Sequence, residues 1–132
     1  MLVVPFNTTQ QAFTCKIIVF NSQNNKSVKI NALWDTGASI STIPGCVVKY
    51  LEIKSVTNVG VKNSTGFTQS LLYRCSFIID GKTNDVFVSS NNLDFALIGM
   101  DLIGKGKMYI DYDRFDKFCL FCTGCKRKSK II

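Results

Sequence analysis

The sequence predicts an all-β domain, and three observations lead to this conclusion. Hydrophobic residues make up 46% of the 132-residue chain, which is enough to build a folded core. β-branched and aromatic residues gather in short runs, separated by Asn, Ser and Gly at intervals of roughly 8–12 residues. No stretch keeps helical periodicity over about twelve residues. We therefore expect a closed β-barrel or a sandwich of sheets.

The expected strands follow one another along the chain. They cover residues 13–20, 27–34, 39–44, 56–62, 67–79, 82–88, 107–111 and 117–121. Turns are expected at 21–26 and 63–66, where Asn, Ser and Gly cluster, and Asp80-Gly81 suggests a two-residue hairpin. The stretch 45–53 has room for one helical turn. No linker interrupts residues 10–121, so we expect one domain over residues 1–121 and a basic tail over 122–132.

The apolar stretch "DFALIGMDLIG" (Asp94–Gly104) predicts a buried strand that ends at a glycine. A short helix is expected to follow this break. Asp101 stands near the start of that helix, and we expect it to cap the helix rather than to take part in chemistry.

The positive charge of the chain is concentrated near its end. Of the net charge of +7, four positive charges come from Lys126, Arg127, Lys128 and Lys130; without them, 12 cations face 9 anions, a net charge of +3. We interpret "CKRKSKII" as a solvated terminus, with contact to nucleic acid, an anionic membrane or an acidic partner as alternatives. Neither an export signal nor a membrane span is evident. We therefore expect a cytoplasmic protein that binds neither membrane nor nucleic acid.

The sequence contains no histidine, which excludes Ser/His and Cys/His catalysis and the usual zinc ligand. In a reducing compartment, we expect Cys15, Cys46 and Cys75 to behave as small apolar residues. The stretch "CLFCTGC" carries Cys119, Cys122 and Cys125 at Cys-x-x-Cys spacing. A metal site that takes a fourth ligand from elsewhere and a redox role are two alternatives. We favour ordinary strand-end cysteines and expect no metal and no cofactor.

The stretch "ALWDTGAS" (Ala32–Ser39) ends an apolar strand on a carboxylate. Asp35 can activate water by accepting its proton. Gly37 lets the backbone come close to that carboxylate, and the hydroxyl of Thr36 can bond to a neighbouring strand. Asp-Thr-Gly is also common in ordinary turns. A phosphate-binding hairpin is a further alternative, but such folds need a longer chain with alternating helices.

One carboxylate is a poor catalyst of peptide hydrolysis, because the reaction needs both a base and an acid. Two carboxyls about 3 Å apart meet this need by sharing one proton. The sequence contains a single Asp-Thr-Gly. A two-fold symmetric dimer would bring two copies of Asp35 together.

"ALWDTGAS" and the later "DFALIGMDLI" together resemble the retropepsin-like aspartic proteases, over roughly Phe13 to Tyr112. The resemblance implies a closed acid-protease barrel with a flap hairpin and one short helix. It also implies a homodimer that acts as an aspartic endopeptidase on a peptide or protein substrate. In it Asp35 is half of the catalytic dyad, Thr36 bonds across the dimer axis and Gly37 contacts the substrate backbone. Met100 stands where many retroviral members have arginine.

By position, the flap of this resemblance covers Val59 to Thr68, with its tip at "NSTG". The expected substrate contacts lie on the loop after Asp35, on the flap and on the late strand: Ala38, Ile40, Val61, Asn63, Ser64, Thr65, Gly66 and Ile98. The alternative from another class is a non-catalytic dimeric module that binds a peptide or nucleic acid on the same fold.

Overall fold

The computed structural model describes residues 2–63, 66–111 and 118–123. The strands and helices are β1 (Leu2–Asn7), β2 (Ala12–Asn21), β3 (Lys26–Trp34), β4 (Thr42–Pro44), α1 (Gly45–Tyr50), β5 (Ser55–Asn63), β6 (Gly66–Ile79), β7 (Lys82–Asn91), β8 (Ala96–Ile98), α2 (Met100–Ile103), β9 (Gly106–Asp111) and β10 (Phe118–Thr123). The chain is mostly strand, at 59%, so the all-β prediction is confirmed.

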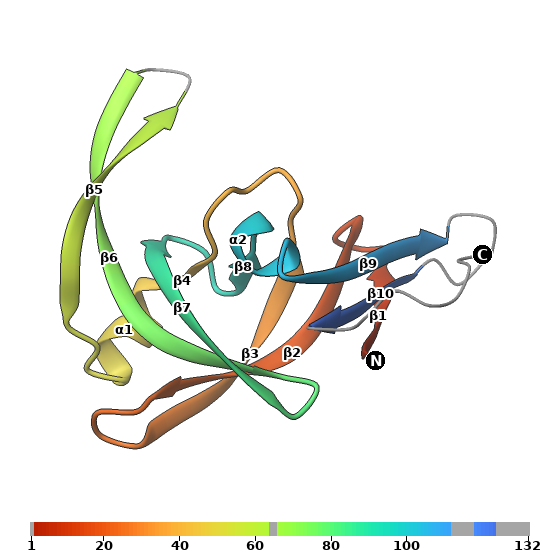
Figure 1. The fold of residues 1–132 in the computed structure, drawn as a ribbon, viewed down its shortest axis with the longest axis horizontal. Helices are drawn as coiled ribbons and strands as arrows, with labels where there is room; N and C mark the ends of the chain where they lie inside the picture. The colour runs from red at the N-terminus through yellow and green to blue at the C-terminus, as the bar shows by residue number, and fades with distance from the viewer. Residues whose placement is uncertain (1, 64–65, 112–117, 124–132) are drawn as a thin grey trace.

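The strands form one curved sheet in the order β5-β6-β7-β4-β8-β3-β2-β1-β10-β9. A further pairing of β6 with β2 joins two distant positions in this order. It closes the six strands from β6 to β2, both included, into the expected barrel, visible in Figure 1. The short strand β8 pairs in parallel with β3 and antiparallel with β4, and so lies at the centre of the barrel wall.

Alternating side chains fill the barrel. On β7, Val86 and Val88 are buried, whereas Asp85 and Phe87 beside and between them are exposed. This period of two is what a sheet with one solvated face requires. Phe77, on the neighbouring β6, is fully buried in the same core. The inward residues are therefore fixed by the pleat of each strand.

The turn between β6 and β7 confirms the hairpin predicted at Asp80-Gly81. Ile79 pairs with Lys82, which leaves two residues in the turn. Both have positive φ, 53° at Asp80 and 73° at Gly81. Two successive positive φ angles match the twist of a two-residue hairpin, and Asp-Gly adopts them at low cost.

The strand β1 was not predicted from the sequence. Leu2 to Pro5 pair with β10, from Phe121 to Phe118, and Phe6 and Asn7 pair with β2. Pro5 obscures the pattern, because proline is confined to edges, ends and irregular positions of a sheet. The first and last described strands of the chain thus lie side by side in one sheet (Figure 1).

Three further details differ from the expectations. Within residues 2–63, 66–111 and 118–123 there are two short helices where the resemblance implied one, because the helical turn expected at 45–53 forms α1 in addition to α2. Of the expected extended piece 39–44, only Thr42–Pro44 is strand. The preceding residues form the loop after Asp35. The strand β10 extends to Thr123, and residues 124–132 of the predicted tail lie outside the described residues.

The hairpin β5–β6 confirms the expected pairing across residues 59–68. Val59 pairs with Ser70 and Asn63 with Gly66; Ser64 and Thr65 lie outside the described residues. A register shift between Ser55 and Thr57 marks the base of the hairpin. In Figure 1 the hairpin rises on the same side of the barrel as the loop that follows β3.

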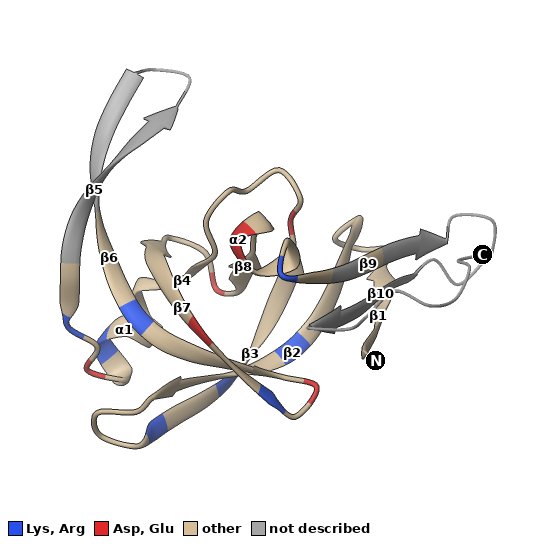
Figure 2. Ribbon diagram, in the orientation of Figure 1, with Lys and Arg blue, Asp and Glu red and all other residues tan. Residues whose placement is uncertain are grey.

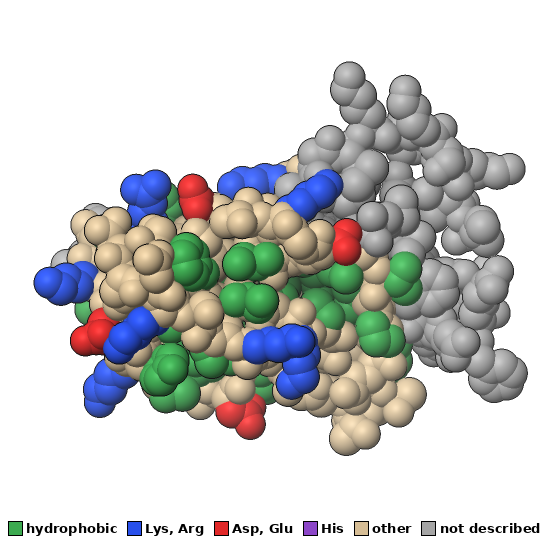
Figure 3. Space-filling view, turned by 90° about the horizontal axis from the view of Figure 1, so that it is seen from below, with side chains coloured by type: hydrophobic (Ala, Val, Ile, Leu, Met, Phe, Trp, Pro, Cys, Tyr) green, Lys and Arg blue, Asp and Glu red, His purple; other side chains and the backbone are tan. Residues whose placement is uncertain are grey.

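Charged and apolar side chains are distributed unequally over the surface. Figure 2 shows Lys and Arg on α1, β2, β3 and β6, while acidic residues mark α2, β7, the β6–β7 turn and the loop between β7 and β8. Seen from below, apolar side chains gather near the middle of the face, with several cationic side chains around them (Figure 3). In the described part of the chain, no helix is long and apolar enough to span a membrane.

Candidate active site

Asp35 follows directly on β3, at a strand end that is fixed from two sides. Trp34 pairs with Ile98 of β8, and the N–H of Asp35 donates to the Ile98 carbonyl at 2.9 Å. The Trp34 side chain is buried, and its Nε1–H donates to Cys15 Sγ at 3.3 Å. Packing and backbone bonds therefore hold the residue just before the carboxylate.

The Asp35 carboxylate is oriented by its own turn. The N–H of Gly37 donates to Asp35 Oδ1 at 2.9 Å, and the N–H of Ala38 donates to the Asp35 carbonyl at 3.2 Å. A Cβ atom at Gly37 would lie 3.2 Å from Oδ1, so any side chain there would crowd the carboxylate. Asp35 is half-buried, and Thr36 and Gly37 are exposed. The carboxylate is thus held in one direction while its surroundings stay open to solvent.

The loop after Asp35 is bound to the start of α2 by backbone bonds. The N–H of Met100 donates to the Ala38 carbonyl at 2.8 Å, and the N–H of Asp101 donates to the Ser39 carbonyl at 3.2 Å. Gly99 is required by close approach, since a Cβ there would lie 2.8 Å from the Ala38 carbonyl oxygen and 3.0 Å from the backbone of Ile40. The two stretches noted in the sequence, "DTGAS" and "LIGMD", are therefore in direct contact.

Ser41 and Asp101 form a second connection that the sequence did not reveal. The Ser41 N–H lies 3.1 Å from both oxygens of the Asp101 carboxylate, and Ser41 Oγ donates to Asp101 Oδ1 at 2.8 Å. Ser41 Oγ in turn accepts the N–H of Gly99 at 2.9 Å. Ser41 is fully buried. We call this arrangement the Ser41–Asp101 clamp; it fixes the far end of the loop that carries Asp35.

The prediction that Asp101 caps α2 is wrong. The N-cap is Gly99, and its position has no side-chain cap. Asp101 lies inside the first turn, where its carboxylate accepts bonds from Ser41 and from the N–H of Leu102. An acidic residue in a first helical turn is ordinary, and Ser41 is 60 residues away in the chain, so no local signal pointed to the clamp.

The predicted substrate-contact residues fall into two groups. Ala38 and Ile40 are half-buried on the loop after Asp35, next to the clamp. Ile98 is adjacent, but its side chain is fully buried in the core and its carbonyl holds the N–H of Asp35. The predicted flap residues lie on the separate hairpin β5–β6: Val61 and Asn63 on β5 and Gly66 on β6. Ser64 and Thr65 lie outside the described residues.

The structure describes the side chains of three of the six cysteines. Cys15, Cys46 and Cys75 are free thiols, and among residues that the structure describes no group of three acidic or cysteine side chains could hold a metal ion. Burial raises the pKa of Cys75 to about 12, with a further contribution from the negative charge of Asp85. Cys75 is therefore a protonated core residue at neutral pH. Cys119 and Cys122 lie on β10, and Cys125 is outside the described residues.

Comparisons with solved structures identify the fold. A retropepsin-like aspartic protease from Rickettsia conorii matches with a TM-score of 0.58 and 21% identity, covering 89% of this chain and 88% of its own. EIAV protease, solved with the inhibitor HBY-793, matches with a TM-score of 0.54 and 15% identity, covering 74% and 90%. The simian foamy virus protease matches with a TM-score of 0.50 and 20% identity, covering 66% and 89%.

The chain has a retropepsin-like fold. The resemblance stated from the sequence is confirmed at this level. Comparisons of the sequence with known protein families and with curated proteins find no match. The retropepsin-like fold is therefore identified from the arrangement of the strands, and the stretches "ALWDTGAS" and "DFALIGMDLI" agree with it.

Proposed function

We propose that the chain is an aspartic endopeptidase that acts as a homodimer. The observation that carries the proposal is the Asp35 carboxylate itself: it stands at the end of β3, accepts the N–H of Gly37 at 2.9 Å and remains half-exposed. A carboxylate used only to cap a turn does not require the loop behind it to be clamped to α2. The retropepsin-like fold supplies the setting in which such a carboxylate can meet a second copy.

The proposed reaction needs two chains, because each contributes one Asp35. Two carboxyls about 3 Å apart cannot both ionise, so one carries a proton. The ionised carboxylate takes a proton from a water molecule, which attacks the carbonyl carbon of the scissile peptide bond. The protonated carboxyl donates its proton to the carbonyl oxygen. The tetrahedral species then collapses: the C–N bond breaks, the amine leaves with the proton taken from the water, and a hydroxyl proton returns to the other carboxyl. No covalent intermediate forms. Thr36 would bond across the dimer axis.

The substrate is proposed to lie extended beneath the hairpin β5–β6, which acts as the flap. Extended peptides bind by adding main-chain hydrogen bonds, as an extra strand does. The backbone of Gly37 would bond to the substrate backbone. Apolar contacts would favour hydrophobic side chains beside the cleaved bond. The proposed contacts come from the Asp35 loop and the hairpin: Ala38, Ile40, Val61, Asn63, Ser64, Thr65 and Gly66.

Replacing Asp35 by Asn tests the proposal. The change removes the general base but keeps the size of the side chain, so we expect cleavage of an apolar peptide to fall by at least about a thousandfold. The assay runs between pH 4 and 7, with circular dichroism and thermal unfolding recorded on the same samples. The fold is expected to persist, because Asn can still accept the N–H of Gly37.

The matched control is Asp94→Asn, which removes an exposed carboxylate that no part of the mechanism uses. It should cleave at the wild-type rate. Equal activity of Asp35→Asn and wild type would exclude the proposed mechanism. Peptide binding without any cleavage by the wild-type protein would instead favour a non-catalytic binding module on the same fold.

A further inference from the structure

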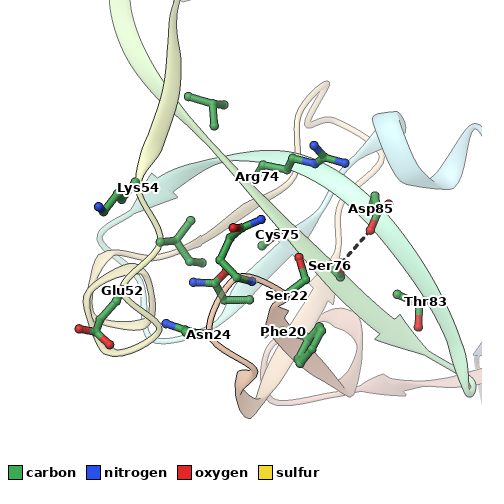
Figure 4. Close-up of a pocket in the computed structure, with 14 residues that line it drawn as sticks. Phe20, Ser22, Asn24, Glu52, Lys54, Arg74, Cys75, Ser76, Thr83 and Asp85 are labelled. Carbon is green, nitrogen blue, oxygen red and sulfur yellow. Dashed lines mark hydrogen bonds between the residues drawn. The ribbon is translucent and has the colours of Figure 1, made fainter.

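A concave site separate from the Asp35 loop lies on the outside of the barrel. It has a volume of about 770 Å³ and is formed by the β2–β3 turn, the connection from α1 to β5, and the adjoining parts of β6 and β7. Figure 4 shows Lys54 on the connection before β5 and Arg74 on β6, with Phe20 and Asn24 on the other side of the site. None of its lining residues belongs to the Asp35 loop, β8 or α2. Its size is in the range of small-molecule sites.

The polar groups beside this pocket hold its walls in place. The side-chain amides of Asn21 and Asn24 both donate to the Leu51 carbonyl, at 2.8 and 3.0 Å. These bonds fasten the β2–β3 turn to the end of α1. On the opposite wall, Ser76 Oγ donates to Asp85 Oδ1 at 2.8 Å. The pocket is therefore preformed from segments that are distant in sequence.

Each acidic side chain of the pocket has a polar partner, whereas its two cations form no ion pair within the described residues. Glu52 pairs with Lys26 at 2.7 Å, and this partner lowers the pKa of Glu52. Asp85 accepts the bond from Ser76. Lys54 and Arg74 are exposed, and neither forms an ion pair within the described residues. Two cations at the rim of the pocket thus remain available to an anion.

The pocket also offers apolar surface next to these cations. Phe20 and Ile53 line it, and so does Val56, which is 52% exposed at the base of β5. An exposed apolar side chain on a strand gains free energy when a ligand covers it. The combination of two cations and an apolar wall selects one kind of molecule, in which an anion is attached directly to a hydrophobic group.

We propose that this pocket binds a carboxylate carried on an apolar body, with Lys54 and Arg74 at the carboxylate and Phe20 and Val56 along the body. A fatty acid and the free C-terminus of an apolar peptide both have this chemistry. Arg74 can engage both oxygens of a carboxylate through its guanidinium, and Lys54 adds a point charge. The proposal does not depend on peptide hydrolysis by the chain.

The proposal is tested by an NMR titration of the ¹⁵N-labelled full chain with octanoate and with N-acetyl-Leu-Phe. We expect saturable shifts in the backbone amides of residues 21–24, 52–56 and 74–76, with a dissociation constant of about 1–10 mM for at least one probe. Octanamide and N-acetyl-Leu-Phe amide, which lack the charge, should bind at least about fivefold more weakly. Whichever acid binds more tightly identifies the source of the carboxylate.

Two variants separate this site from general attraction of anions. The double variant Lys54→Gln/Arg74→Gln should weaken binding by about tenfold, because it removes both cations. Lys16→Gln removes an exposed cation from β2 that does not line the pocket, and should change binding by less than about twofold. The proposal is overturned by equal binding of acids and amides, by an unaffected double variant, by shifts centred on residues 35–41, or by no saturation.

Discussion

Ser41 shows how a single buried hydroxyl can stabilise a candidate catalytic loop. Its Oγ donates to Asp101 at 2.8 Å and accepts from the N–H of Gly99 at 2.9 Å. Both partners lie at the junction of β8 and α2, whereas Ser41 ends the loop that begins at Asp35. A buried donor that loses its partner costs about 1–3 kcal/mol. The clamp is therefore important for the position of the loop.

Replacing Ser41 by Ala is expected to lower the free energy of unfolding by about 1–3 kcal/mol, since the Gly99 N–H loses its acceptor. Urea unfolding monitored by tryptophan fluorescence measures the change. The control Ser39→Ala removes an exposed hydroxyl from the same loop and should stay within about 0.5 kcal/mol of wild type. If the two variants were equally stable, the clamp would have no energetic role.

The buried thiol of Cys75 should make the free energy of unfolding depend on pH in the alkaline range. Its pKa is raised to about 12 in the folded chain, mainly by burial, from an ordinary value of 9.0. Between about pH 9 and pH 12 the folded state keeps the thiol proton that the unfolded state loses. The free energy of unfolding is therefore unaffected by this group below about pH 9 and falls as the pH rises above it. We expect the free energy of unfolding to fall by up to about 1.4 kcal/mol per pH unit from this group.

The difference between wild type and Cys75→Ala isolates that contribution. Denaturant unfolding between about pH 8.5 and 10.5 should show a shallower decline for Cys75→Ala than for wild type. Cys46→Ala, which removes an exposed thiol, should decline as wild type does. Parallel curves for all three proteins would contradict the assignment of a buried, protonated thiol at Cys75.

Among the elements, the β6–β7 hairpin is the one whose local sequence agrees most closely with its structure. Asp80-Gly81 supplies both positive φ angles, and the strands on either side pair without interruption from Tyr73 to Ile79. Such agreement arises because turn chemistry acts over two residues. The strand β1 is the opposite case. Its pairing with β10 joins residues more than a hundred positions apart, and nothing within Leu2–Asn7 encodes that partner.

The variant Gly81→Ala tests how much the glycine in the β6–β7 turn contributes to stability. The φ of 73° at this position disfavours any residue with a Cβ, so we expect a loss of about 1 kcal/mol. Thermal unfolding measures it. Gly45→Ala is the comparison, because Gly45 begins α1 and a Cβ there would meet its nearest atom only at 3.8 Å; alanine should be neutral or stabilising there. An equal loss in both variants would count against the turn argument.

At the scale of the whole molecule, the proposed activity depends on association of two chains, since a single chain has one Asp-Thr-Gly. When chains are mostly dissociated, the dimer concentration varies with the square of the chain concentration. We therefore expect the activity per chain to fall about tenfold for each tenfold dilution in that range. Sedimentation at the same concentrations reports the dimer directly.

A tandem protein, in which two copies of the chain are joined by a flexible linker, provides the control for dilution. Tethering keeps the second copy at an effective concentration of about 1 mM, so the activity per chain of the tandem protein should not change on dilution. A separate chain that stays monomeric and keeps constant activity at every concentration would contradict the requirement for two chains.

Local sequence was sufficient to predict the all-β class, most of the strands, the Asp80-Gly81 turn and the position of Asp35 at a strand end. These features depend on residues close together in the chain: alternation, turn chemistry and the acid after an apolar run. Only the folded chain revealed the closure of β6 on β2, the pairing of β1 with β10, the Ser41–Asp101 clamp and the pocket beside Arg74. Each of these joins distant segments, and the hydrogen bonds between such segments leave no periodicity in either one.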